Sequence, residues 1–368
     1  MIVWLTRAWV SLIVGTVFFA SSAQAHSDPE TSSNQHTEAR TPFPTKDATQ
    51  YLEALSQEHE IPGLAVAVIR DGQLAYLGLA GTQDGEIPVT DETQFHSASI
   101  SKLFTATAIM QLVDAGKLDL DQPLGAIFPK FEDKRITIRR LLTHRAGFAN
   151  RVRARGEIDR VSTDEYLGKV QRKGLSYPPG TKWRYNDADY NILGAVVTKV
   201  SGMQFDRYAR RFIFEPLGMK KSSFFLPDVL PSYRAAPHRG SSAKLTSRHP
   251  YDFNFAPSSG LQISATDLAL FLVAHLRKDT VLLNVSSYNL MQQAVSETEI
   301  QGIEQGLGWQ VLESPDRPKI LQHGGSDRGF RALVSIQPAN GTGIVILSNG
   351  ENTPRWEIAA QLQRFLDQ

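Results

Sequence analysis

The most informative absence in this sequence is cysteine, of which the 368 residues contain none. Disulfide bonds, thiolate catalysis, cysteine-ligated zinc and lipid attachment through an N-terminal cysteine are therefore excluded. A charge imbalance is also missing. The net charge is +1, so nothing in the composition indicates a nucleic-acid partner or an anionic membrane surface. The 41% hydrophobic and 21% charged residues are typical of a folded globular chain.

Several motifs of nucleotide, metal and hydrolase chemistry are missing as well. The sequence has no G-x-x-x-x-G-K-[ST] loop, no G-x-G-x-x-G and no H-E-x-x-H, and it lacks the G-x-S-x-G elbow of α/β-hydrolases. Its nine histidines show no paired metal-ligand spacing. We therefore expect neither a metal ion nor a cofactor, and the remaining candidates are hydrolytic.

The first 25 residues have the pattern of a signal peptide. Arg7 gives the positive start, residues 8–20 are apolar but short for a membrane span, and residues 23–25 (AQA) form a small-x-small cleavage site before His26. The alternative is an uncleaved anchor. We expect cleavage and export, to the periplasm in a Gram-negative cell, with no stable membrane insertion afterwards. Residues 26–45 are polar and are expected to form a disordered leader.

Hydrophobic periodicity predicts an α/β fold of the α+β type. Residues 47–60 are predicted as a helix capped by Asp47, followed by a hairpin of strands 64–70 and 73–80 around an Asp-Gly turn. The C-terminal third mirrors this order, with strands 330–337 and 342–347 joined by an Asn-Gly turn. A last helix follows, with Pro354 in its first turn; its apolar face is Trp356, Ile358, Ala359, Leu362, Phe365 and Leu366.

This mirrored order predicts one antiparallel sheet flanked by the N- and C-terminal helices. Residues 46–368 would form a single domain with two lobes. The α/β lobe would contain residues 46–125 and 246–368, and residues 126–245, which lack strand-like alternation, would form a mainly helical lobe. The active site is expected between the two lobes.

Ser99 and Lys102 form an S-x-x-K motif, which places both side chains on one helix face. A serine hydroxyl is a poor nucleophile until a base takes its proton, and burial would lower the pKa of a lysine enough for that role. Residues 101–115 are apolar almost all round, which predicts a buried helix with an oxyanion-stabilising N-terminus. The alternative is an N-cap serine beside a surface lysine, and the tetrapeptide does not distinguish the two.

A second S-x-x-K, from Ser241 to Lys244, shows that context carries the inference. Its neighbours include Arg239, Arg248 and His249, and no apolar helix follows it. We interpret this copy as a solvated loop.

The segment 95–102 (FHSASISK) resembles the active-site stretch of the class C β-lactamase and penicillin-binding protein superfamily. Other matches follow in the family's order and extend the resemblance from about residue 50 to the end of the chain. They are residues 141–147 (LLTHRAG), 177–180 (YPPG), 185–194 (YNDADYNILG), 216–219 (PLGM), 259–261 (SGL), 306–309 (GLGW) and 323–326 (HGGS). Ordered motifs at plausible spacing are far more specific than any one of them.

The resemblance implies a role for each matched residue. Ser99 would be acylated, and Lys102 and Tyr185 would form the proton-transfer network, with the pKa of Tyr185 lowered by the lysine charge. Backbone N–H groups of Ser99 and Ser326 would form the oxyanion hole. The ordinary structural explanation of Tyr185 is a core aromatic beside Trp183.

The third motif implies a strand against which a substrate lies. Gly324 and Gly325 would leave its edge free of side chains, although a bulge or turn would also use glycines there. His323 stands where the family has lysine or histidine, and a mostly neutral histidine is a weak anchor for a substrate carboxylate. This places efficient β-lactam hydrolysis in doubt.

The second motif departs from the family pattern, because Asp187 replaces its usual asparagine. An amide donates a hydrogen bond to a substrate carbonyl, whereas a carboxylate only accepts. We expect Asp187 to pair with Lys102 and hold it protonated, which moves the base role towards Tyr185.

Eight arginines between Arg135 and Arg160 crowd the helical lobe; we interpret them as a solvated face, with an anion-attracting rim as the alternative.

Two classes of function remain at this point. The first is a serine hydrolase acting through an acyl-enzyme on an ester, a β-lactam or a cell-wall-like peptide. Esterases or amidases, D-amino-acid peptidases and β-lactamases all belong to it. The second is a non-catalytic penicillin- or peptidoglycan-binding or sensor protein with the same fold.

Overall fold

The computed structural model describes residues 41–368, except residues 151, 153–157, 241–242 and 247. The predicted signal peptide and residues 26–40 of the predicted leader lie outside this range. Residues 42–368 form one compact unit. Among the described residues, no helix has the length and hydropathy needed to cross a membrane.

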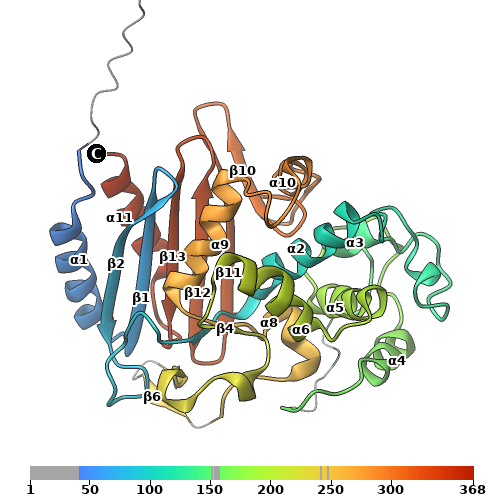
Figure 1. The fold of residues 1–368 in the computed structure, drawn as a ribbon, viewed down its shortest axis with the longest axis horizontal. Coiled ribbons are helices and arrows are strands. Elements are labelled where there is room, and N and C mark those ends of the chain that lie inside the picture. The colour runs from blue at the N-terminus through green and yellow to red at the C-terminus, as the bar shows by residue number, and fades with distance from the viewer. Residues whose placement is uncertain (1–40, 151, 153–157, 241–242, 247) are drawn as a thin grey trace, which may run out of the picture. The chain divides into compact units, whose positions relative to one another are not determined.

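An antiparallel sheet of eight strands forms the centre of this unit (Figure 1). Its strands, in spatial order, are β2 (Gln73–Gly81), β1 (Gly63–Arg70), β13 (Thr342–Ser348), β12 (Phe330–Gln337), β11 (Arg317–Asp327), β10 (Gln310–Ser314), β9 (Glu304–Gln305) and β8 (Ser296–Glu297). The first and last parts of the chain therefore meet in the pairing of β1 with β13. The predicted α/β class and both hairpins are confirmed.

The turn between β1 and β2 follows from its two residues. Asp71 and Gly72 both have positive φ, at 53° and 68°, which is the backbone of the tight hairpin turn that an Asp-Gly pair favours. Arg70 then pairs with Gln73.

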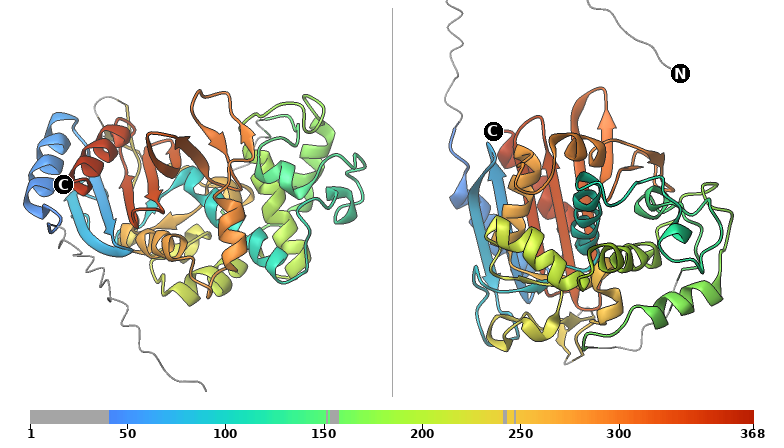
Figure 2. Two further views of the ribbon diagram at one scale, coloured as in Figure 1. Left: turned by 90° about the horizontal axis from the view of Figure 1, so that it is seen from above. Right: turned by 45° about the vertical axis from the view of Figure 1, so that its right-hand side comes forward.

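Helices cover both faces of the sheet, and β1 shows why both are needed. Its residues Leu64, Val66 and Val68 pack into a cluster with α1 (Thr45–Glu58) and α11 (Arg355–Leu366). The alternate residues pack into the larger cluster with α2 (Ser101–Asp114) and α9 (Ala265–Arg277). Successive side chains of a strand point to opposite faces, so β1 is buried throughout. Figure 2 shows α1 beside α11.

Two details of the predicted terminal helices are wrong. α1 begins at Thr45 after Pro44, so Asp47 lies in its first turn and is not the cap. At the other end, Pro354 precedes α11 instead of lying within it, and Trp356 is 48% exposed. The Trp356 ring lies over Gly324 of β11, a residue without a side chain to pack against it.

The remaining elements lie mostly beyond the sheet, in the region predicted to be helical and rich in loops. Its helices are α3 (Ile138–Leu142), α4 (Asp164–Lys173), α5 (Asp187–Ser201), α6 (Phe205–Ala209) and α7 (Glu215–Leu217); α8 (Ala256–Ser259) and α10 (Val285–Met291) follow later in the chain. The short strands are β3 (Phe95–His96), β4 (Ser222–Ser223), β5 (His238–Arg239), β6 (Lys244–Leu245) and β7 (Gln262–Ile263). The α2 helix is buried along almost its whole length, as predicted, and it contacts both α5 and α8.

His275 on α9 gives this core a dependence on pH. The ring packs against Phe271, Tyr288 and Trp309, and neither nitrogen has a hydrogen-bond partner among the described residues. Burial lowers its pKa to about 3. The unfolded chain binds this proton near pH 6.5 and the folded chain only near pH 3, so stability falls as the pH drops through that window.

We predict that His275→Phe removes this part of the acid sensitivity. The free energy of unfolding should fall less steeply from pH 6 to pH 4, by up to about 1.4 kcal/mol per pH unit, because one proton is no longer taken up on unfolding. Urea unfolding at a series of pH values measures the slope. Equal slopes for the two proteins would contradict the prediction.

Candidate active site

Ser99 lies in a short 3₁₀ turn, Ala98–Ile100, directly before α2. The turn is held from behind, since the hydroxyl of Ser101 donates to the Ala98 carbonyl (2.7 Å) and accepts from the backbone N–H of Leu261 (3.0 Å). Ala98 has a φ of 48°, a strained conformation for a residue with a Cβ. Ser99 is partly exposed in an otherwise buried stretch. A partly exposed hydroxyl on a fixed, strained turn is a suitable geometry for a nucleophile.

The Lys102 side chain is fully buried and its ammonium group has three acceptors. Its Nζ lies 3.1 Å from the Ser99 hydroxyl, 2.7 Å from the Asp187 carboxylate and 2.8 Å from the Ser258 carbonyl on α8. The predicted pairing of Asp187 with Lys102 is confirmed. The surface-lysine alternative is excluded for this motif.

The expectation that the pKa of Lys102 falls is wrong, whereas the expectation that Asp187 holds Lys102 protonated is confirmed. Burial acts in that direction, but the charge of Asp187, and after it Tyr185, raises the pKa further, and the net change is upward. The isolated helix pattern predicts the burial of the lysine but does not show its counter-ion. Lys102 therefore rests as an ammonium ion.

Tyr185 lies beside this ammonium group, which is 4.8 Å from the centre of its ring. Its hydroxyl is buried and makes no hydrogen bond of good geometry with the described residues. The expectation of a lowered pKa is wrong here too: burial raises the pKa of Tyr185, and the opposing effect of Lys102 is smaller. Tyr185 rests as a neutral phenol whose hydroxyl lies within reach of Lys102 and Ser99.

Asn186 positions both neighbouring residues, and sequence reasoning missed it. It caps α5, because its side chain accepts from the Ala188 N–H (3.0 Å) and donates to the Phe148 carbonyl (2.9 Å). Its own N–H donates to Nδ1 of His144 (3.2 Å). The signal was available, since asparagine before an acidic first turn is typical of a helix start.

Two further residues near Lys102 were also missed. His144 and Asp189 are both 1% exposed, with Nδ1 and Oδ2 3.7 Å apart. Burial raises the pKa of Asp189 well above its usual value and lowers that of His144 well below its own, so desolvation favours the neutral form of both. Nothing in the sequence indicates that the Ser258 carbonyl binds Lys102, because every residue has a backbone carbonyl.

The third motif lies on β11, where that strand has a free edge. β12 pairs with β11 as far as Asp327, but β10 pairs with it only up to Gln322. Among the described residues, no strand pairs with residues 323–327 on the side of β10. The predicted strand edge is present.

Glycine at position 325 was expected to keep the strand edge free of side chains, but the structure shows a different reason for it. A Cβ at Gly325 would lie 2.3 Å from the Ser97 carbonyl oxygen, so glycine is needed for the strand to approach the Ser99 turn. A Cβ at Gly324 would make an ordinary contact with Trp356, at 3.4 Å. Ser326 is exposed at the end of this stretch.

His323 is buried beneath the edge, 3% exposed, with its ring 6.3 Å from that of Tyr185. Burial, and after it the Lys102 charge, lowers its pKa to about 3, which makes it neutral as expected. Nδ1 donates to the Gly324 carbonyl (3.0 Å), which is the tautomer that a carbonyl partner requires of a neutral ring.

The residues outside this group fit the simpler interpretations. Lys244 of the second S-x-x-K is exposed on β6, whereas Ser241 lies outside the described residues. Among the described arginines of the helical region, Arg135, Arg139 and Arg160 form ion pairs with aspartates; Arg151, Arg153 and Arg155 lie outside the described residues. In the described part of the chain, no three His, Asp or Glu side chains group closely enough to hold a metal ion.

Together, the sheet flanked by helices and the Ser99–Lys102 pair facing a free strand edge define a serine hydrolase fold of the β-lactamase and penicillin-binding protein type. The beta-lactamase family model matches residues 48–368, and the chain belongs to this family.

Known relatives carry both kinds of name. Penicillin-binding protein 4 of Amycolatopsis lactamdurans is 29% identical, over 84% of this chain and 86% of its own length. The beta-lactamase of Escherichia coli K12 is 26% identical, over 84% and 91%. An octameric penicillin-binding protein homologue from Pyrococcus abyssi has a similar structure, with a TM-score of 0.77 and 25% identity over 87% of this chain and 77% of its own. A class C beta-lactamase superposes with a TM-score of 0.76 at 21% identity over 87% and 95%, which shows the shared fold.

The two glycines of β11 provide a matched test of this geometry. We predict that Gly325→Ala destabilises the protein by about 2 kcal/mol, because its Cβ would collide with a backbone carbonyl that cannot move alone. Gly324→Ala should change stability little. Urea unfolding measures both, and equal effects of the two substitutions would contradict the proposed contact.

Proposed function

We propose that this protein is an exported serine hydrolase that forms an acyl-enzyme on Ser99 and cleaves an ester, amide or β-lactam bond. The observation that carries the proposal is the 3.1 Å contact between the Ser99 hydroxyl and the fully buried Lys102 ammonium. Export rests on the signal-peptide pattern, and the mass of the protein recovered from the cell envelope tests it: mature chains should begin at His26.

The hydrogen bonds of Lys102 suit a proton transfer without rearrangement. As an ammonium, it donates to Ser99, Asp187 and Ser258. As a neutral amine, it would still donate to Asp187 and Ser258, while its lone pair accepts from the Ser99 hydroxyl. The same three contacts therefore serve both charge states. The attacking step then needs only that one proton leave Lys102 first.

Tyr185 is the group we propose for the next proton transfer. Its hydroxyl lies within reach of Lys102 and Ser99 and would pass a proton from Lys102 to the departing group. In deacylation it would accept a proton from the attacking water as it returns its own to the Ser99 oxygen. Backbone N–H groups of Ser99 and of Ser326, at the free edge, would bind the developing oxyanion. Esters, D-amino-acid peptides and β-lactams remain the candidate substrates.

The same pKa shifts favour a second candidate, a non-catalytic penicillin- or peptidoglycan-binding protein. Neither Lys102 nor Tyr185 rests in its basic form, so acylation or deacylation would be slow at neutral pH. A relative named penicillin-binding protein is compatible with this candidate.

Turnover of model substrates distinguishes the two candidates. The mature protein is tested with a chromogenic cephalosporin, 4-nitrophenyl butyrate and a D-Ala-D-Ala peptide, and by labelling with a fluorophosphonate. We expect turnover of at least one substrate, and Ser99→Ala should abolish labelling and lower turnover at least about 10³-fold. Ser241→Ala, in the second S-x-x-K, is the matched control and should behave as wild type. Labelling without turnover would favour the binding protein, and the absence of both would refute the enzyme.

The Asp187 charge should set the pH dependence of the reaction. Asp187 raises the pKa of Lys102, so Asp187→Asn lowers it, and Lys102 loses its proton at a lower pH. We therefore predict that the rising limb of kcat/KM against pH moves to lower pH in this variant, measured with 4-nitrophenyl butyrate. Asp164→Asn changes the first residue of α4 in the same way, away from Lys102, and should leave the profile in place. An unchanged profile in Asp187→Asn would contradict the role of this pair.

A further inference from the structure

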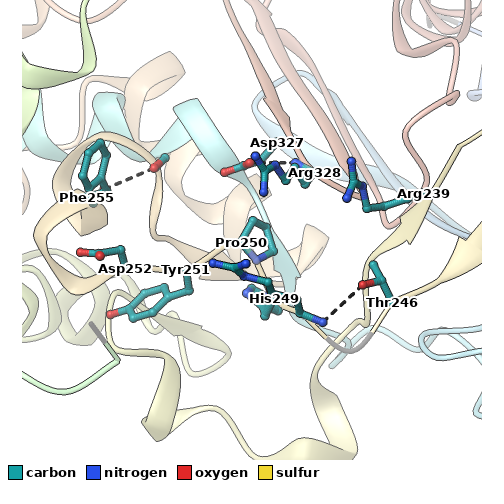
Figure 3. A pocket seen from close by; sticks show the side chains of 11 residues that line it. Arg239, Thr246, His249, Pro250, Tyr251, Asp252, Phe255, Asp327 and Arg328 are labelled. Carbon is teal, nitrogen blue, oxygen red and sulfur yellow. Dashed lines mark hydrogen bonds between the residues drawn. The ribbon is translucent and has the colours of Figure 1, made fainter. Parts of the chain in front are cut away.

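A pocket of about 420 Å³ adjoins the candidate active site. Figure 3 shows the side chains that line it. Two of its lining residues are chain neighbours of site residues. Ser259 follows Ser258, whose carbonyl binds Lys102, and Asp327 follows Ser326 at the end of β11. Asp327 also accepts a hydrogen bond from Nε2 of His96 (3.1 Å), on the strand that leads into the Ser99 turn. The pocket is therefore continuous with the free edge of β11.

The direction of β11 decides which part of a substrate would reach this pocket. His323 lies at the Tyr185 end, and Asp327 lies four residues further along the strand, about 13 Å away at the usual rise of a strand. The leaving group must take its proton from Lys102 and Tyr185, so it departs at the Tyr185 end. The acyl half, which stays on Ser99, then extends along the edge towards Asp327 and the pocket.

Three arginines and two aspartates line the pocket. The arginines are Arg239, Arg248 and Arg328, and Arg239 pairs with Glu351. Arg248 and Arg328 form no ion pair with the described residues and are both exposed. Both guanidinium groups are therefore accessible to an anion, although the charged carboxylate of Asp327 lies next to Arg328 in the chain.

The two acids of the pocket are already engaged. Asp327 accepts from His96 and from the backbone N–H of Arg328 (2.7 Å). Asp252 accepts from the Asn254 N–H (2.8 Å) and caps the short helix there. The close view places Asp327 and Arg328 across the pocket from Tyr251 and Asp252 (Figure 3). Both carboxylates keep their charge, but neither forms an ion pair with Arg248 or Arg328.

His249 adds an independent sign that a polar ligand belongs here. It lines the pocket, and its two ring nitrogens are buried without a hydrogen-bond partner among the described residues. Its ring packs against His96 and Phe330, with 5.3 Å between ring centres in each case. Buried polar atoms are almost always bonded in a native protein, so an unpaired ring at a pocket wall is suited to a ligand oxygen.

We propose that this pocket binds an acidic group on the acyl half of the substrate, with Arg248 and Arg328 as its ion-pair partners and His249 as a hydrogen-bond donor. The class of substrate is then an ester or amide of an acid that carries a second carboxylate. This proposal rests on the proposed function of Ser99 and adds to it a preference that none of the motif residues would produce.

A pair of esters with the same leaving group tests the proposal. Mono-4-nitrophenyl adipate and 4-nitrophenyl hexanoate have six-carbon acyl chains and differ in the terminal carboxylate. We expect kcat/KM for the adipate ester to exceed that for the hexanoate ester by about fivefold, chiefly through KM, as for a solvent-screened ion pair. The ratio should fall towards one in 0.5 M NaCl and in Arg248→Gln/Arg328→Gln. Arg317→Gln, an exposed arginine at the opposite end of β11, is the matched control and should keep the wild-type ratio.

Other outcomes are equally definite. A wild-type ratio of one or less, or a ratio unchanged in the double variant, overturns the proposal. So does an acid preference that appears only when the carboxylate is on the leaving group, tested with the hexanoate ester of 4-hydroxy-3-nitrobenzoic acid. If neither ester is hydrolysed, the proposed function fails instead. Calorimetric titration of Ser99→Ala with the adipate ester then decides the pocket by itself: saturable binding weakened in the double arginine variant supports it, and no binding refutes it.

Discussion

The buried ammonium of Lys102 is the constraint on which the rest of the site depends. A charge with no solvent around it is costly unless it is paired and fully hydrogen-bonded. Lys102 meets this condition with the Asp187 carboxylate, the Ser258 carbonyl and the Ser99 hydroxyl, which come from three separate elements. The ammonium thus fixes α5 and α8 against α2. The α5 and α8 helices are also in close contact, because a Cβ on Gly194 of α5 would lie 2.1 Å from a ring carbon of Pro257 on α8.

The same burial makes the groups around Lys102 neutral. His323, His144 and Asp189 all have pKa values moved towards the uncharged form by desolvation. Charge at the centre of the site is therefore concentrated in the pair of Lys102 and Asp187. An anionic substrate finds little net attraction there, whereas Arg328 and Arg248 line the pocket at the far end of β11. The groups that position Ser99 at the centre of the site are therefore physically separate from the arginines proposed to recognise the substrate at the end of β11.

Much of the fold and part of the site could be predicted from local sequence. The Asp-Gly pair predicted the turn between β1 and β2, and the apolar run after Ser101 predicted a buried α2 helix. The pairing of Asp187 with Lys102 was predicted from the substitution in the second motif. The pKa of Tyr185 was predicted in the wrong direction. For Lys102, the expected fall in pKa on burial is outweighed by the effect of Asp187, which was expected to hold Lys102 protonated. The net pKa shift of each group is the difference between a desolvation effect and a Coulomb effect of similar size. Both effects depend on distances that sequence spacing does not contain.

Gly325 shows most clearly which features the sequence determines and which depend on the tertiary structure. By itself, the sequence determined which residues carry reactive groups, which segments are apolar, and that glycine stands at position 325. Only the folded chain decided that this glycine faces the Ser97 carbonyl, that β10 stops pairing at Gln322, and that Ser258 offers its carbonyl to Lys102. The physical reason is the same in each case. Backbone groups are identical in every residue, so their contacts are set by how distant segments pack and leave no mark in the sequence.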